Sequence, residues 1–201
     1  MIRKNILFLF FILISFQVFS QDKHVSEVIN KMLSACDNLK SSSFVLKATE
    51  RLKDGTLHES EVIVKLQRNP LKIYVYSINP NPGAEGLWRI GELNNHVLVN
   101  PNGFPFFNLK LNTHNPLLRK GQHHTIEEMG FDYISNMFKD YIGKYNVELL
   151  KNFSVQGNVQ FDGRNCIQLV YENPAYNYGV YTASAGESLT SIAHVNFVSD
   201  Y

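Results

Sequence analysis

Residues 44–78 read FVLKATERLKDGTLHESEVIVKLQRNPLKIYVYSI, and this stretch decides the fold. Residues 44–52 and 57–66 are rich in strand-forming side chains and flank the Asp-Gly pair at 54–55, a strong hairpin signal. A third strand is predicted over 72–78, directly after an Arg-Asn-Pro turn. The stretch therefore predicts antiparallel strands that follow one another in a meandering sheet.

Two helices and further strands are predicted around this sheet. Apolar residues recur at three- and four-residue steps over 22–39 and 131–142, so each segment predicts an amphipathic helix. Thr125 and Glu128 have the spacing of a capping box ahead of the second helix. This order of elements is typical of an α+β fold and not of alternating βαβ units. The further strands are predicted over residues 87–90, 97–99, 104–111, 147–155, 158–161 and 165–171. The Asp-Gly pair at 162–163 is a second hairpin signal, and residues 112–124, polar and broken by Pro116 and Gly121, are expected to form a loop.

The first twenty residues have the composition of a secretory signal peptide. Arg3 and Lys4 form a positive start, and the apolar run over 6–16 is shorter than the ~20 residues that span a bilayer. We therefore predict a signal peptide at 1–20, a periplasmic or otherwise secreted protein, and no membrane span after its removal. Its removal leaves 17 of the 19 basic residues against 18 acidic ones, a net charge of −1. That charge offers no electrostatic footprint for nucleic acid or an anionic membrane.

Cys36 and Cys166 are the 2 cysteines of the chain. Two interpretations stay open: they form a disulfide in an oxidising compartment, or each is a small buried side chain. The sequence does not supply the Cα separation that decides whether a disulfide is possible.

Histidines and carboxylates near residue 124 form the densest set of potential metal ligands. His123 and His124 are adjacent, and His114, Glu127 and Glu128 lie nearby in the sequence. Adjacent histidines at a loop end are able to bind zinc, but HExxH spacing is missing. The two glutamates also suit a helix N-terminus, where the helix dipole stabilises negative charge. We therefore predict no metal, and an enzyme with these histidines in its site remains an alternative.

Other candidate catalytic residues have simpler structural explanations. Ser188 lies in a sequence that lacks the second glycine of a nucleophile elbow, and it is predicted to cap a helix. Glu59 and Glu61 share one face of a strand, and an exposed face explains both. The sequence has no phosphate-binding loop and no dinucleotide fingerprint. No catalytic residue and no cofactor are therefore predicted.

Five short motifs connect the body of the chain with a known family. They are RLKDG at 51–55, RNP at 68–70, Gly86, VNPNG at 99–103 and HTIEEMG at 124–130. In these motifs and in the order of its elements, the chain resembles the bacterial family called domain of unknown function 1571.

The layout is also similar to that of the carriers that move lipoproteins across the periplasm. This resemblance implies a half-barrel, a curved antiparallel sheet packed against two helices over an apolar cavity that suits an acyl chain. The alternative is that the aromatic side chains simply fill the core. The expected cavity residues are Tyr74, Tyr76, Trp88, Phe104, Phe106, Phe107, Met137 and Phe138.

Residues 181–201 read YTASAGESLTSIAHVNFVSDY, with a Gly-Glu-Ser turn followed by apolar residues at helical spacing. This pattern resembles the opening of a LysM module. LysM modules hold N-acetylglucosamine-containing glycans, so the resemblance implies peptidoglycan as a partner. The second helix and the closing strand of such a module do not follow, so the tail is expected to be a partial module. The implied glycan-binding residues are Gly186, Glu187, Ser188, Leu189 and Thr190.

These observations predict a signal peptide at 1–20, a lipoprotein-carrier-like α+β domain at 21–174, and a linker with a partial LysM-like segment at 175–201. The first hypothesis is a non-catalytic secreted protein that holds a lipid or lipoprotein acyl chain and associates with the envelope through peptidoglycan. The alternatives are a hydrolase of envelope glycan or lipid, and a structural envelope protein whose aromatic side chains are only core.

Overall fold

The structure is a computed structural model and describes residues 24–52, 54–145, 150–172 and 180–196. The signal peptide predicted at 1–20 lies outside these residues. Among the helices that the structure describes, none is long and apolar enough to cross a membrane.

The chain divides into two compact units. The first, called the sheet unit below, comprises Asn38–Ile134 and Thr182–Tyr201. The second, called the hairpin unit, comprises Met1–Asp37 and Ser135–Tyr181. The domain predicted at 21–174 therefore contains parts of both units.

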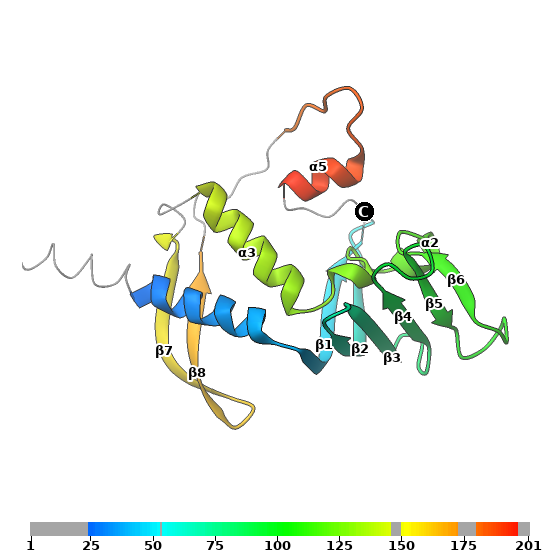
Figure 1. The fold of residues 1–201 in the computed structure, drawn as a ribbon, viewed down its shortest axis with the longest axis horizontal. Coiled ribbons are helices and arrows are strands. Elements are labelled where there is room, and N and C mark those ends of the chain that lie inside the picture. The colour runs from blue at the N-terminus through cyan, green and yellow to red at the C-terminus, as the bar shows by residue number, and fades with distance from the viewer. Residues whose placement is uncertain (1–23, 53, 146–149, 173–179, 197–201) are drawn as a thin grey trace, which may run out of the picture. The chain divides into compact units, whose positions relative to one another are not determined.

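The sheet unit is built on six antiparallel strands, each hydrogen-bonded to the next strand along the chain (Figure 1). This order confirms the predicted meandering sheet within an α+β fold. The sheet is not closed, because β1 and β6 are its two edges. The strands are β1 (Ser41–Arg51), β2 (Leu57–Gln67), β3 (Lys72–Asn79), β4 (Glu85–Arg89), β5 (His96–Asn100) and β6 (Leu109–Asn112).

Alternation along β2 and the chemistry of its turn explain the first hairpin. Val64 and Leu66 are buried, whereas Lys65 between them is exposed, so one face of the strand packs into the core. In the turn, the Asp54 carboxylate accepts hydrogen bonds from the backbone N–H and the hydroxyl of Thr56. The predicted hairpin is therefore confirmed, and its register follows from the turn.

The strand predicted over 104–111 differs from the structure. Only its C-terminal part is a strand, as β6, and the aromatic residues before it form the loop between β5 and β6. Pro105 lies in this loop and has no backbone N–H to donate to a ladder. Side-chain composition favoured a strand here, but the missing donor interrupts pairing.

Two short helices within the sheet unit cover one face of the sheet. They are α2 (Pro116–Arg119) and η1 (Ile126–Glu128), a 3-10 helix. Leu118 from α2 and Ile126 from η1 pack into the hydrophobic core formed by β2 to β5. The sequence predicted a loop over 112–124, and α2 is short enough to have escaped a periodicity argument.

The predicted capping box is present but starts a different helix from the one expected. Thr125 and Glu128 satisfy each other's backbone N–H groups at the start of η1. The long helix, α3 (Phe131–Tyr145), begins separately after it. In its first turn, Asp132 accepts two contacts from the guanidinium of Arg68, so the RNP motif fixes the start of α3.

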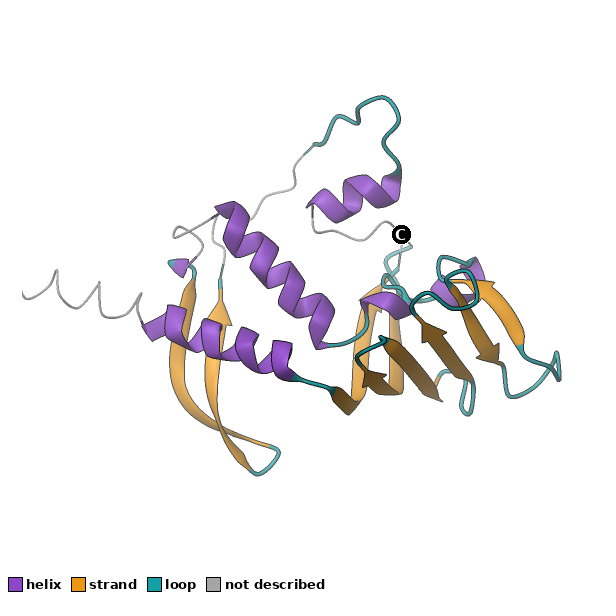
Figure 2. Ribbon diagram, in the orientation of Figure 1, coloured by secondary structure: helices purple, strands orange, loops and turns teal. Residues whose placement is uncertain are grey.

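The hairpin unit consists of a helix over residues 24–38, the later part of α3, and a two-stranded sheet (Figure 2). The strands are β7 (Phe153–Phe161) and β8 (Arg164–Tyr171). The predicted helix at the start of the chain is confirmed, and its residues Val25, Ile29 and Leu33 are buried against Phe153.

The β7–β8 hairpin confirms one turn prediction and corrects a strand boundary. Asp162 and Gly163 both have positive φ, as the predicted Asp-Gly turn requires. The sequence predicts two strands, over 147–155 and 158–161. Residues 147–149 lie outside the described part of the chain, and the rest contains one strand from residue 153 to 161, with a bulge between Val155 and Asn158. Cys36 and Cys166, both in this unit, are free thiols and half-buried.

Candidate functional site

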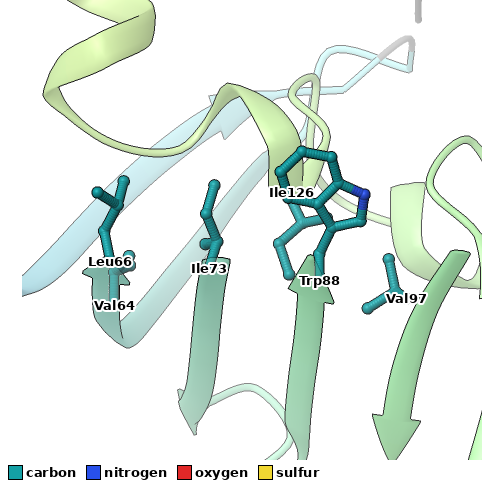
Figure 3. Close-up of a cluster of buried hydrophobic side chains, with 6 residues drawn as sticks. All are labelled: Val64, Leu66, Ile73, Trp88, Val97 and Ile126. Carbon is teal, nitrogen blue, oxygen red and sulfur yellow. The ribbon is translucent and has the colours of Figure 1, made fainter. Parts of the chain in front are cut away.

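One face of the six-stranded sheet, called the covered face below, is a continuous apolar surface. Figure 3 shows its buried side chains projecting to the same side of the sheet. They are Val64 and Leu66 of β2, Ile73 of β3, Trp88 of β4, Val97 of β5, and Ile126 of η1, which lies over the strands. Burying each of the aliphatic side chains in this set contributes about 1.5–3 kcal/mol to stability. The covered face is therefore the core of this unit.

Trp88 is the predicted cavity residue that lies on the covered face. Its side chain is 3% exposed, and its indole N–H donates to Asn95 Oδ1 at 3.0 Å. The amide of Asn95 in turn approaches Glu127 Oε1 at 3.5 Å. The polar tip of the indole is thus satisfied, and Asn95 ties the β4–β5 turn to η1.

Gly86 forms a notch in the covered face. A Cβ at this position would lie 3.6 Å from Ile126 Cδ1 and 3.6 Å from Val97 Cγ1, which is ordinary contact. Because Gly86 has no side chain, Ile126 is able to occupy the space above it. An alanine fits here, whereas a larger side chain would compete with Ile126 for the same space.

Tyr74 and Tyr76 lie on the opposite face of the sheet. They alternate with buried Ile73 along β3, and successive side chains of a strand point to opposite faces. The Tyr74 hydroxyl donates to Glu85 Oε1 at 2.5 Å, and Lys65 Nζ lies 5.6 Å from the centre of its ring. The bond to Glu85 raises the pKa of Tyr74 to about 12.

The remaining expected cavity residues are divided between the two units. The three phenylalanines of 104–107 are exposed in the β5–β6 loop. Met137 and Phe138 belong to the hairpin unit, where the Phe138 ring lies 5.9 Å from that of Phe153. The sequence grouped these side chains by type, whereas the structure places Trp88 alone of the eight on the covered face.

His123 and His124 have separate partners and do not form one ligand set. His123 Nε2 lies 2.8 Å from the Arg51 carbonyl oxygen and 3.8 Å from Glu50 Oε2. His124 Nδ1 lies 3.3 Å from Glu128 Oε2. In the described part of the chain, no three His, Cys, Asp or Glu side chains are placed to hold a metal ion.

The other polar candidates take part in structural contacts or are exposed. His114 Nδ1 lies 3.2 Å from the Thr113 hydroxyl. Glu61 pairs with Lys47 at 3.3 Å across the β1–β2 ladder, and Glu59 is exposed on the same strand. These positions agree with the exposed strand face expected for the two glutamates.

The LysM-like segment contains a capped helix, α5 (Leu189–Asn196). The Ser188 hydroxyl accepts the Ser191 N–H at 3.0 Å, and the Ser191 hydroxyl accepts the Ser188 N–H at 3.0 Å. Ser188 is therefore a helix cap, as predicted. The five residues expected to contact glycan, 186–190, are all exposed.

A polar clamp that the sequence did not reveal holds the loop after α2 on the end of the β1–β2 hairpin. Its members are Glu50, His58, Arg119, Gly121 and His123. The Glu50 carboxylate accepts the His123 N–H, and Arg119 Nη2 donates to the His123 carbonyl at 2.6 Å. The backbone of Gly121 lies directly against the His58 ring. The observed hairpin register places Glu50 opposite His58, but no local signal in the sequence brings the distant loop to them.

Comparison with known families shows which family the chain belongs to. The family model described as "Protein of unknown function (DUF1571)" matches residues 39–185, which include all eight strands of the described structure. The chain belongs to the DUF1571 family. This confirms the predicted family, and two of the motifs now have structural roles in this DUF1571 protein, because Arg68 pairs with Asp132 and His124 with Glu128. No curated protein and no solved structure matches the chain.

We predict that Gly121→Ala lowers the free energy of unfolding by about 2–4 kcal/mol, because it combines backbone strain with a steric clash. Gly121 has a φ of +78°, and a Cβ there would lie 2.6 to 3.0 Å from ring atoms of His58. The matched control is Gly91→Ala, where φ is +74° and nothing lies within 4 Å, so only strain of about 1–2 kcal/mol is expected. Urea unfolding measures both, and equal losses would contradict the close contact with His58.

The half-exposed pair of His124 and Glu128 makes stability depend on pH. The hydrogen bond to Glu128 raises the pKa of His124 above 6.5 and outweighs the opposing effect of burial. Burial raises the pKa of Glu128, but hydrogen bonds from His124 and from the Thr125 backbone outweigh it and hold that pKa below 4.5. The contribution of His124 is therefore lost as pH rises through its folded pKa. The contribution of Glu128 is lost as pH falls through its own.

We predict that His124→Gln destabilises the protein at pH 6 and has no electrostatic effect at pH 8.5. The expected loss at pH 6 is below about 1 kcal/mol, because solvent screens a pair that is this exposed. The measurement is urea unfolding at both pH values. Glu128→Gln is the matched variant, because glutamine keeps the capping bond to Thr125 and removes only the charge. A loss that is the same at both pH values would show that packing, and not charge, stabilises the pair.

Proposed function

We propose that this DUF1571 protein is a secreted, non-catalytic binding protein that holds a lipid or lipoprotein acyl chain against the covered face, with the sheet acting as a half-barrel. One observation supports this most directly. The covered face presents apolar side chains from four neighbouring strands, and among the described residues a four-residue helix and a three-residue 3-10 helix pack side chains over it. Short covers of this kind are displaced at a smaller free-energy cost than a long packed helix.

The magnitudes favour exchange of the cover for an acyl chain. Each buried CH₂ contributes about 0.8 kcal/mol, so ten buried methylenes contribute about 8 kcal/mol. Withdrawing Ile126 from the covered face costs about 1.5–3 kcal/mol, and Met129 beside it costs a similar amount. The difference between this gain and this cost is available to offset the entropy lost when the acyl chain and the displaced segment become ordered.

Envelope association is the second part of the proposal. The predicted signal peptide directs the protein out of the cytoplasm, and the LysM-like segment offers an exposed Gly-Glu-Ser turn ahead of a capped helix. In LysM modules this turn belongs to the glycan-binding surface, so peptidoglycan is the proposed anchor.

The two alternatives differ in their support. The hydrolase alternative requires His123 and His124 to act together, but each is bonded to a different partner. The structural alternative treats Trp88 as core filling, and its burial agrees with that role equally well. Ligand binding therefore has to be measured at Trp88 itself.

We predict that a brominated fatty acid quenches the fluorescence of Trp88, the 1 tryptophan of the chain. Quenching by bromine requires contact, so it reports entry of the acyl chain to the covered face, and the unbrominated acid serves as control. Gly86→Leu, which competes for the place of Ile126, should abolish quenching, whereas Gly86→Ala should retain it. Native mass spectrometry of the secreted protein then gives the stoichiometry. Unchanged Trp88 emission together with a ligand-free mass would favour the structural alternative.

We also predict that the chain co-sediments with purified peptidoglycan and that Glu187→Ala reduces the bound fraction severalfold. The Glu187 carboxylate accepts the Ser184 N–H at 2.6 Å and so fixes the proposed glycan-binding turn. Glu172→Ala, which removes an exposed carboxylate outside this segment, is the matched control. Equal retention of all three proteins would remove the LysM-like segment from the proposal.

A further inference from the structure

The β5–β6 loop exposes three phenylalanine rings to solvent within four residues. Phe104 is 87% exposed, Phe106 88% and Phe107 66%. A single exposed apolar side chain needs no explanation, but a contiguous apolar group of this kind marks a contact surface. The sheet unit buries little of these rings, so folding does not account for them and binding is the better explanation.

The loop holds its rings in a defined arrangement. At its base, the Asn102 N–H donates to Asn100 Oδ1 at 3.0 Å, and its side-chain amide donates to the Pro82 carbonyl at 3.0 Å. At its tip, the rings of Phe104 and Phe106 meet edge to face, with centroids 6.3 Å apart. The rings are therefore preorganised, which lowers the entropy lost when they become buried in a partner.

The β5–β6 loop and the β3–β4 loop beside it are uncharged. Asn102 joins the β5–β6 loop to the β3–β4 loop, so the two loops lie together at one end of the sheet. The sequence has no charged residue and no histidine from 97 to 109, and none from 79 to 84. The two loops consist mainly of phenylalanine, proline, asparagine and small residues, and the nearest charged side chain at their base is Glu85, which accepts from the Asn100 amide at 3.4 Å.

We infer that the β5–β6 loop docks the protein on a lipid bilayer, with the three rings inserted at the boundary between headgroups and acyl chains. A protruding, uncharged, aromatic tip suits this boundary, where apolar side chains bury about 5–10 Å deep. Because the loop has no basic residues to attract anionic headgroups, we expect it to bind zwitterionic lipid.

This docking surface is independent of the proposed acyl-chain site. The three rings lie outside the covered face, so loss of bilayer binding leaves the Trp88 quenching experiment unaffected. Failure of one proposal is therefore distinguishable from failure of the other.

The first test is co-sedimentation of the full chain with sucrose-loaded phosphatidylcholine vesicles. Replacing all three phenylalanines by serine should lower the partition constant at least a hundredfold, and Phe106→Ser alone about tenfold. The matched control is Phe161→Ser, which removes a single exposed ring, 74% exposed, from the end of β7 and should leave binding unchanged. Binding should persist at high salt. All variants carry the same apolar residues 6–16, so only differences between them count.

The second test places a reporter in the loop. In Phe106→Trp, the new indole should shift its emission to the blue on addition of vesicles and be quenched by brominated phosphatidylcholine, relative to the parent with Trp88 only. An unshifted, unquenched Trp signal would overturn the proposal, as would a triple serine variant that binds like the parent. Binding only to anionic vesicles and only at low salt would also overturn it, and so would self-association through the loop without vesicle binding.

Discussion

The structure of the sheet unit depends on Ile126 lying over the covered face. An antiparallel sheet with one apolar face is unstable until that face is covered, and here the chain returns after β6 to cover it. Gly86 supplies the space and Trp88 supplies the largest neighbouring surface. The cover is a single 3-10 turn, so its position cannot come from the stiffness of a long helix.

Polar contacts at the margins therefore fix this cover. The capping box of Thr125 and Glu128 defines where η1 begins, and Asn95 bridges Glu127 to the Trp88 indole. On the other side, the clamp around Glu50 and His123 anchors the preceding loop. Each hydrogen bond contributes only about 0.5–1.5 kcal/mol net, yet together they select one position for an element with little packing of its own.

Local sequence chemistry predicted the elements that are determined locally. The Asp-Gly turns at 54–55 and 162–163 and the alternation in β2 gave correct hairpins, because turn geometry and side-chain period fix the register. The capping box was also correctly recognised, but the sequence did not show which helix it starts. Long-range contacts were missed: the pairing of Arg68 with Asp132, and of Glu50 with His123, joins residues separated by more than sixty positions. No periodicity or turn signal carries that information.

The aromatic side chains show why residue type alone does not define a site. Trp88 is buried with its N–H satisfied, so folding explains it fully. Tyr74 lies on the opposite face of the sheet and its hydroxyl donates to Glu85, so contacts within the sheet account for this residue as well. The phenylalanines of 104–107 differ because they are mostly exposed and the fold obtains little burial energy from them. Of the three environments, only this one requires something outside the chain to account for its apolar surface, and an uncharged bilayer boundary meets that requirement.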